Sequence, residues 1–260
     1  MNQPHLHWIK EGQGPVLVLS HALGCDLSMW DGVAALLKRR YTVLRYAHRG
    51  HGQSEAPTGP YSLAMLADDA ASLIGTQAEG PVHFVGLSLG GMTAQALAVR
   101  HPALVKSIAI ANAANWYDDA ARAMWQARVD TVLAQGVAAI ADGAMQRWFT
   151  PAFRADVAGG GAACVAALRE RLEKTDAAAY AASCEAVAAI DFRVSNRSIQ
   201  CPALVIGGTL DEATPVAMSQ AIADSISGAQ LCTLEAAHLS AVEQPEAFAQ
   251  LLESFFDSLK

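Results

Sequence analysis

The stretch "VGLSLGG", Val85–Gly91, places one serine, Ser88, among three glycines. It follows the apolar run "VHFVG" at 82–86, which predicts a buried strand, and it leads into a predicted helix that begins near Gly90. In the pattern Gly-x-Ser-x-Gly, small neighbours permit a sharp strand-to-helix turn that exposes the serine at the edge of a sheet. The stretch therefore predicts an α/β protein in which Ser88 is a nucleophile.

Further apolar runs recur along the chain, and each is bounded by turn residues. They predict strands at 16–20, 42–46, 107–111 and 203–207, with helical stretches such as 62–76 and 92–100 between them. Runs that are apolar at nearly every position are typical of parallel strands buried on both faces. Alternation of such strands with helices predicts a doubly wound, mostly parallel sheet.

The alternation stops in the middle of the chain. Residues 115–191 are rich in Ala, Arg, Glu and Trp and are predicted to be helical throughout, after which the strand pattern resumes. We therefore expect an α/β core formed by residues 1–114 and 192–260, with 115–191 inserted as a helical cap over one end of the sheet.

Composition limits the classes of partner. The 260 residues are 52% hydrophobic, carry a net charge of −7 and contain no run of Lys or Arg, which argues against nucleic acid or an acidic membrane as the partner. The N-terminal residues lack a secretory signal pattern, and no apolar run reaches about 18 residues. We expect a cytoplasmic protein that binds a small molecule; homo-oligomerisation stays open.

No metal site is expected. The close histidine pairs, His5 with His7 and His48 with His51, lack cysteine or carboxylate company at zinc-site spacing. The five cysteines are odd in number and without CxxC spacing, so they are predicted to be small buried apolar side chains: Cys25, Cys164, Cys184, Cys201 and Cys232. We expect no cofactor.

A serine nucleophile needs a histidine base that a carboxylate orients. Asp211 follows the strand predicted at 203–207, at the edge where ligands of such sheets bind. Glu212 is the competing acid, but Asp211 leads the turn "DEATP" before a predicted helix. His238 follows a strand-like run and is the only histidine after Asp211. The order Ser, Asp, His is that of the nucleophile-elbow hydrolases.

Acyl transfer also needs donors for the oxygen that gains negative charge. The backbone amide of Leu89, directly after the nucleophile, is the first candidate. The second is the amide of Leu23 in the loop "SHALGCDLSMW", which follows the strand predicted at 16–20.

Several stretches together resemble the β-ketoadipate (3-oxoadipate) enol-lactone hydrolases of the α/β-hydrolase superfamily: "SHALGCDLSMW", "RGHGQSEAPTGPYSL", "GLSLGGMTAQALA", "RWFTPAF", "YAASCEAVAAIDFR" and "AAHLSAVEQPEAF". The resemblance implies hydrolysis of a small cyclic enol ester in aromatic catabolism, with Ser88, Asp211 and His238 as the triad. Two pairs depart from the family pattern, His21-Ala22 in place of Asn-Ser and Ala47-His48 in place of Asp-Thr.

Residues of the cap are candidates for substrate binding. Trp125 and Arg128 are three positions apart and share a helix face, and Arg147 adjoins Trp148. The enol-lactone of the resembled family bears a carboxylate that an arginine could bind. The alternative is that the tryptophans pack the cap against the core and the arginines are solvated. Arg49 is expected to brace its own loop.

Two other functions stay open. A general aryl or short-chain esterase, or a perhydrolase, would use the same three residues on another acyl group. A ligand receptor would keep the fold and its pocket with little turnover.

Overall fold

The computed structural model describes residues 3–259 and contains a seven-stranded sheet in the order β1-β3-β2-β4-β5-β6-β7. The strands are β1 (Trp8–Gly12), β2 (Val16–Ser20), β3 (Thr42–Tyr46), β4 (Val82–Leu87), β5 (Val105–Ala111), β6 (Ala203–Gly208) and β7 (Gln230–Leu234). Only β1 runs antiparallel to its neighbour, and every other pair in this sheet is parallel. The prediction of a mostly parallel α/β sheet is confirmed.

The apolar runs predicted β2 to β6, and the strand-like run before His238 is β7; β1 was not predicted. It lies at the edge of the sheet, paired only with β3, and Trp8 and Ile9 are each 38% exposed. A strand with one open edge and an exposed face does not need the continuous apolar run of a central strand. By contrast, all six residues of β4 are buried, and this strand ends directly before Ser88.

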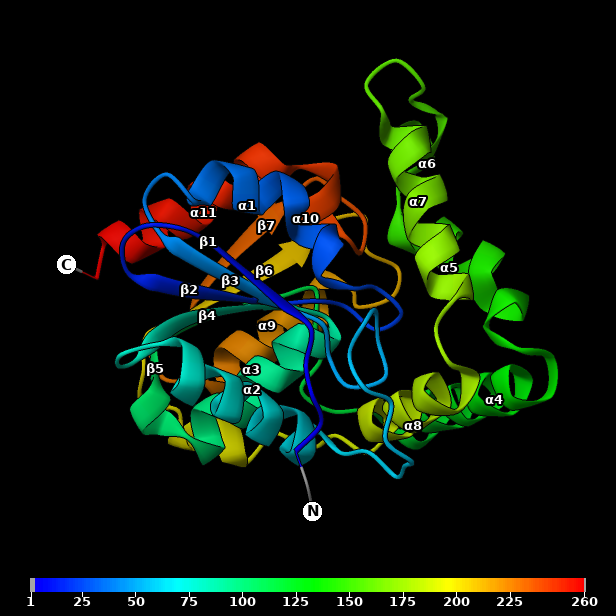
Figure 1. The fold of residues 1–260 in the computed structure, drawn as a ribbon, viewed down its shortest axis with the longest axis horizontal. Helices are drawn as coiled ribbons and strands as arrows, with labels where there is room; N and C mark the ends of the chain where they lie inside the picture. The colour runs from blue at the N-terminus through cyan, green and yellow to red at the C-terminus, as the bar shows by residue number, and fades with distance from the viewer. Residues whose placement is uncertain (1–2, 260) are drawn as a thin grey trace.

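Helices cover both faces of the sheet, with α1 and α11 on one side and α2, α3 and α9 on the other (Figure 1). Their bounds are α1 (Asp31–Leu37), α2 (Leu63–Gln77), α3 (Leu89–Arg100), α9 (Val216–Ser225), α10 (Ser240–Glu243) and α11 (Pro245–Asp257). In α11 the residues Phe248, Leu252 and Phe255 are buried at helical spacing, and Phe248 lies 5.8 Å from the Trp30 ring. Short 3-10 helices cover Leu27–Trp30, Pro102–Leu104, Val137–Ile140 and Ser195–Ser198.

The five helices between β5 and β6 lie together beyond one end of the sheet, not on either of its faces (Figure 1). They are α4 (Asp119–Gln135), α5 (Ala141–Trp148), α6 (Pro151–Ala155), α7 (Gly161–Glu173) and α8 (Ala177–Ala188). The two ends of this segment meet: Trp116 forms an antiparallel bridge with Asp191, and the Phe192 N–H donates to the Asn115 carbonyl at 2.7 Å. The segment thus leaves the core and returns to it at one place.

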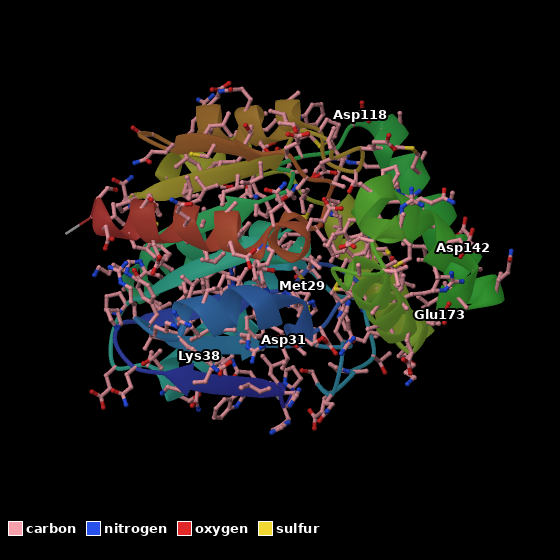
Figure 2. The ribbon with its side chains drawn as sticks, turned by 90° about the horizontal axis from the view of Figure 1, so that it is seen from above. Met29, Asp31, Lys38, Asp118, Asp142 and Glu173 are labelled. Atoms are coloured by element: carbon pink, nitrogen blue, oxygen red, sulfur yellow. The ribbon has the colours of Figure 1, made fainter. Side chains whose placement is uncertain are left out.

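Polar contacts join helices within this segment. Arg169 of α7 binds Glu173 one turn later at 2.8 Å and also pairs with Asp142 of α5. Figure 2 shows Asp142 and Glu173 on the outer side of the segment, turned away from the sheet. On its inner side, the helical segment is attached to the core by side-chain packing and by a backbone hydrogen bond. In this bond the Leu239 N–H donates to the Trp148 carbonyl at 3.0 Å. The helices therefore rest against the loop that follows β7.

Over residues 3–259 no helix is long and apolar enough to cross a membrane. All five cysteines are free; Cys25 and Cys184 are buried, and the other three are half-buried.

Candidate active site

Ser88 occupies the turn between β4 and α3, with φ 56° and ψ −112°. A non-glycine residue rarely adopts positive φ, and holding one there costs about 1–3 kcal/mol. Backbone hydrogen bonds hold the turn on both sides. The Ser88 N–H donates to the Ala111 carbonyl at 2.9 Å, and the Ser88 carbonyl accepts from the Met92 N–H at 2.9 Å. The predicted strand-to-helix turn is present at the carboxyl end of β4.

The glycines on either side of Ser88 are required by close backbone contacts. A Cβ atom on Gly86 would lie 2.0 Å from the Gly90 carbonyl oxygen, and one on Gly90 would lie 2.0 Å from the Ser20 carbonyl oxygen. Neither contact leaves space for a methyl group. The end of β2 and the start of α3 therefore pack directly against the turn that carries Ser88.

Asp211 and His238 follow β6 and β7 and meet at the same edge of the sheet. Oδ2 of Asp211 lies 2.9 Å from Nδ1 of His238, and both residues are 5% exposed. Since Nδ1 faces the carboxylate, Nε2 is the imidazole nitrogen left for other chemistry. Glu212, the competing acid, is exposed and forms no hydrogen bond with His238 within the described chain.

Asp211 is held as a carboxylate by several donors. Burial alone would raise its pKa, but the adjacent His238 imidazole and hydrogen bonds to the carboxylate outweigh this and lower the pKa of Asp211 to about 2. The Thr214 N–H donates to Oδ1 at 2.9 Å, and the Thr214 hydroxyl donates to Oδ2 at 2.7 Å. Asn112 Nδ2 donates to Oδ2 at 2.9 Å. A carboxylate fixed in this way can orient an imidazole.

A cavity of about 280 Å³ opens between these loops and the helical segment. Ser88 and His238 line it together with the other predicted residues Leu23, Trp125, Arg128, Arg147 and Trp148; further lining residues are Tyr117, Ala121, Met124, Tyr180, Glu212, Ala213, Thr214 and Met218. Of the residues predicted from the sequence, Asp211 and Leu89 do not line it: Asp211 contacts His238, and the Leu89 side chain is fully buried. The structure thus gathers the predicted set around one cavity.

The two arginines of this cavity lack a carboxylate partner. The Arg128 guanidinium lies 4.7 Å from the Trp125 ring centroid, and within residues 3–259 neither Arg128 nor Arg147 forms an ion pair. Burial lowers the pKa of Arg147, and the positive charge of Arg128 lowers it further. Glu212 lines the same cavity and its charge acts on Arg147, but two cations against one carboxylate still make this part of the cavity attractive to an anion.

Unlike the two arginines of the cavity, Arg49 forms an ion pair with a carboxylate. Its guanidinium binds Asp69 through two contacts of 2.6 Å, both side chains are buried, and it does not line the cavity. Arg49 braces its loop.

Two backbone amides at this cavity are candidates for binding an oxygen, one from Leu89 next to Ser88 and one from Leu23, which lines the cavity with Ser88. The Leu89 N–H opens α3, where the first amides of a helix have no intrahelical partner and the helix dipole is positive. The Leu23 N–H belongs to the loop after β2. Neither amide donates a hydrogen bond to the part of the chain that the structure describes. Both are free to bind an oxygen near Ser88.

Sequence reasoning missed Asn112, Thr214, Tyr117 and Tyr180. Asn112 directly follows β5, so its place at the carboxyl edge of the sheet was a usable signal. The two tyrosines are buried in the cavity wall and come from the helical segment or its entrance, where periodicity does not show which face turns inward.

A parallel sheet with a strained serine turn, followed along the chain by a paired Asp and His, defines the α/β-hydrolase class. A comparison with family models agrees: the model of the alpha/beta hydrolase family matches residues 17–251, and the chain belongs to this family.

Within the family, the chain is similar to enol-lactonases. It is 39% identical to 3-oxoadipate enol-lactonase 2 of Acinetobacter baylyi, with 96% of this chain and 92% of the relative covered. It is 34% identical to 3-oxoadipate enol-lactonase 1 of the same organism, with 95% and 90% covered. The crystal structure of the enol-lactonase from Burkholderia xenovorans LB400 superimposes with a TM-score of 0.93 at 37% identity, over 98% of both chains. The resemblance noted in the sequence is confirmed.

Proposed function

We propose that this protein hydrolyses a small carboxylic ester of the lactone class, with the enol-lactone of 3-oxoadipate as substrate. The observation that carries the proposal is the pairing of His238 with Asp211 at 2.9 Å beside a cavity that Ser88 also lines. The similarity to enol-lactonases over nearly the whole chain supports the choice of substrate.

In the first half of the reaction Ser88 attacks the lactone carbonyl carbon while Nε2 of His238 accepts the serine proton. Asp211 holds the other imidazole nitrogen and stabilises the imidazolium. The carbonyl oxygen becomes negative and binds the amides of Leu23 and Leu89; removing such a donor costs about 3–4 kcal/mol of barrier. The acyl carbon–oxygen bond of the ring then breaks, and His238 returns the proton to the enol oxygen.

In the second half water completes the turnover. His238 takes a proton from water, the hydroxide attacks the acyl carbon, and the Ser88 oxygen leaves with the proton that His238 returns. The product is a carboxylic acid whose enol converts to a ketone in solution. Besides the substrate and this water, the steps use side chains and amides of the chain.

Residues 115–191 are proposed to act as a cap that holds the substrate. Arg128 and Arg147 would bind the free carboxylate of the enol-lactone, and Trp125 and Trp148 would pack against its ring. The unpaired positive charges and the lining of the cavity support this assignment.

The test of substrate is the rate of the purified protein on 3-oxoadipate enol-lactone, on neutral lactones and on p-nitrophenyl acetate. A kcat/KM far higher on the enol-lactone is expected. Activity confined to p-nitrophenyl acetate or the neutral lactones would keep the Ser88 mechanism but assign the cap to a different substrate. Arg128→Met should lower kcat/KM for the anionic lactone relative to the neutral esters. Arg122→Met, on the same helix but outside the cavity, is the matched control. It should leave kcat/KM unchanged for both the anionic lactone and the neutral esters.

Substitution and chemical labelling of Ser88 test the mechanism. Ser88→Ala should fold and lose activity, and a fluorophosphonate probe should label Ser88 in the unmodified chain only. Activity that survives in a folded Ser88→Ala protein would contradict the proposal. A Ser88 that the probe does not label would favour a ligand receptor on the same fold.

A further inference from the structure

His21 lies in the loop after β2, two residues before Leu23, and both of its ring nitrogens have backbone partners. Nδ1 lies 2.7 Å from the Ala22 carbonyl oxygen, and Nε2 lies 2.9 Å from the His48 backbone nitrogen. A carbonyl only accepts and an amide N–H only donates, so Nδ1 carries the proton and Nε2 accepts. His21 is therefore a neutral imidazole in one fixed tautomer.

The Ala22 carbonyl and the Leu23 N–H belong to the same peptide group. A trans peptide is planar, so the direction of its carbonyl sets the direction of its N–H. The Ala22 oxygen accepts from His21 Nδ1 and also from the Cys25 N–H at 3.1 Å. Two donors on the oxygen fix the plane and, because chained hydrogen bonds polarise one another, strengthen the Leu23 N–H as a donor.

The His48 contact holds the imidazole ring in turn. It joins the loop after β2 to the loop after the neighbouring strand β3, and Nε2 of His48 also lies 2.9 Å from the Ser20 hydroxyl. The Ser20 carbonyl is the group against which Gly90 packs, two residues from Ser88. The histidines thus connect the Leu23 peptide to the turn that carries Ser88.

The surroundings keep His21 uncharged. Its ring is fully buried, with ring centroids 4.7 Å from His48 and 5.2 Å from His51. Burial, with a smaller contribution from the neighbouring His51, lowers the pKa of His21 to about 3. The single tautomer therefore persists at neutral pH.

We propose that His21 is a positioning residue that orients the Ala22–Leu23 peptide so that the Leu23 N–H binds the oxygen that becomes negative in the reaction. The proposal rests on the proposed function, because it assumes acyl transfer at Ser88. It assigns a role to a position at which this chain departs from the resembled enol-lactone hydrolases.

Two substitutions of His21 test its contact with Ala22 and its contact with His48 separately. Asparagine places an N–H donor near the position of Nδ1, so His21→Asn keeps the contact with Ala22. Glutamine reaches the position of Nε2, so His21→Gln keeps only the contact with His48. We expect kcat of His21→Asn within about threefold of the wild-type value. For His21→Gln we expect kcat to fall at least tenfold with KM nearly unchanged, since complete loss of such a donor costs about 10²–10³-fold.

The rate of fluorophosphonate labelling gives a second readout, because the phosphoryl oxygen uses the same donors. It should fall in His21→Gln by the same factor as kcat. His83→Gln is the matched control, a buried histidine in β4 that binds Ser107 at 2.7 Å away from the cavity, and it should keep the wild-type kcat. Melting temperatures show whether each variant folds.

The proposal is overturned if folded His21→Gln keeps the wild-type kcat, if both His21 variants lose kcat equally, or if His83→Gln loses as much as His21→Gln. Should His21→Gln not fold, a folded His21→Asn that loses more than tenfold in kcat also overturns it. Failure of the proposed function looks different, because folded Ser88→Ala would then stay active.

Discussion

Asn112 and Asp211 stand 99 positions apart in the sequence, yet Asn112 Nδ2 donates to Asp211 Oδ2 at 2.9 Å. Asn112 ends β5 in a left-handed conformation, with φ 46°, and its own Oδ1 accepts from the Ser240 hydroxyl at 2.6 Å. One amide therefore connects the end of β5 with the loop after β6 and, through the Ala237 carbonyl at 3.4 Å, with the loop after β7. These loops carry the acid and the histidine of the proposed triad, so the amide fixes where the two meet.

Removal of the Asn112 amide should weaken catalysis without abolishing it. A hydrogen bond to a charged group contributes about 1.5–3 kcal/mol, and about 1.4 kcal/mol is a tenfold change in rate. We expect Asn112→Ala and Asn112→Gly to lower kcat by about 10–100-fold at nearly constant KM. Since φ is positive, Asn112→Ala should unfold at lower urea than Asn112→Gly. Wild-type kcat in both variants would show that Asp211 needs no such support.

Substitutions of Asp211 and of its neighbour Glu212 test which carboxylate orients His238. Asp211→Asn removes the carboxylate that faces His238 Nδ1, and we expect kcat to fall about 10⁴-fold, as for loss of the acid in other triads. Glu212→Gln changes a neighbouring carboxylate on the cavity wall that does not touch His238, so kcat on p-nitrophenyl acetate should stay within threefold. Steady-state rates of both variants decide the matter, and the reverse ranking would make Glu212 the acid.

The sequence predicts the central sheet well because buried parallel strands carry an unmistakable apolar pattern. The edge strand β1 lacks that pattern and escaped prediction, since its environment is half solvent. β5 begins at Val105, two residues before the predicted start, because Val105 pairs with Val82 of β4. α3 begins at Leu89, one residue before the start predicted near Gly90, because the sharp turn at Ser88 sets its end.

The site was predictable only in part, for a physical reason. Ser88, Asp211 and His238 stand at strand ends whose positions the fold class dictates. The contact of Asn112 with Asp211 depends on the register of two strands that the whole helical segment separates along the chain. The inward position of Tyr180 depends on how α8 packs, which helical periodicity alone does not give.

The glycines around Ser88 should tolerate no side chain. A Cβ atom on Gly90 would lie 2.0 Å from the Ser20 carbonyl oxygen, which is backbone and cannot move aside without shifting β2. We expect Gly90→Ala to lose more than about 3 kcal/mol of unfolding free energy, or to fail to fold. Gly75→Ala, in α2 with nothing within 4 Å of the added atom, should gain about 0.5–1 kcal/mol. Urea unfolding measures both, and equal effects would contradict the steric argument.

The buried histidines should make the fold sensitive to acid well above the range in which carboxylates titrate. Burial lowers the pKa of His21 to about 3 and of His51 to about 4, and it lowers the pKa of His48 well below its usual value. In the unfolded chain the pKa of each imidazole is about 6.5, so below that pH the unfolded state binds more protons than the folded state. The stability that this difference provides is complete above pH 6.5 and is lost as the pH falls toward 4.

Each of these three groups contributes a slope of up to about 1.4 kcal/mol per pH unit, so together they give at most about 4 kcal/mol per pH unit near pH 5. Urea unfolding at pH 7.5, 6.0 and 5.0 measures the slope. His51→Gln should reduce the slope by up to about 1.4 kcal/mol per pH unit, because it removes one buried imidazole. Within residues 3–259 the one hydrogen bond of this ring is to the Arg49 carbonyl. His5→Gln, at an exposed position, is the control and should keep the wild-type slope. An unfolding free energy that stays constant between pH 7.5 and 5.0 would show that the folded protein takes up these protons, and that the cluster is not held neutral.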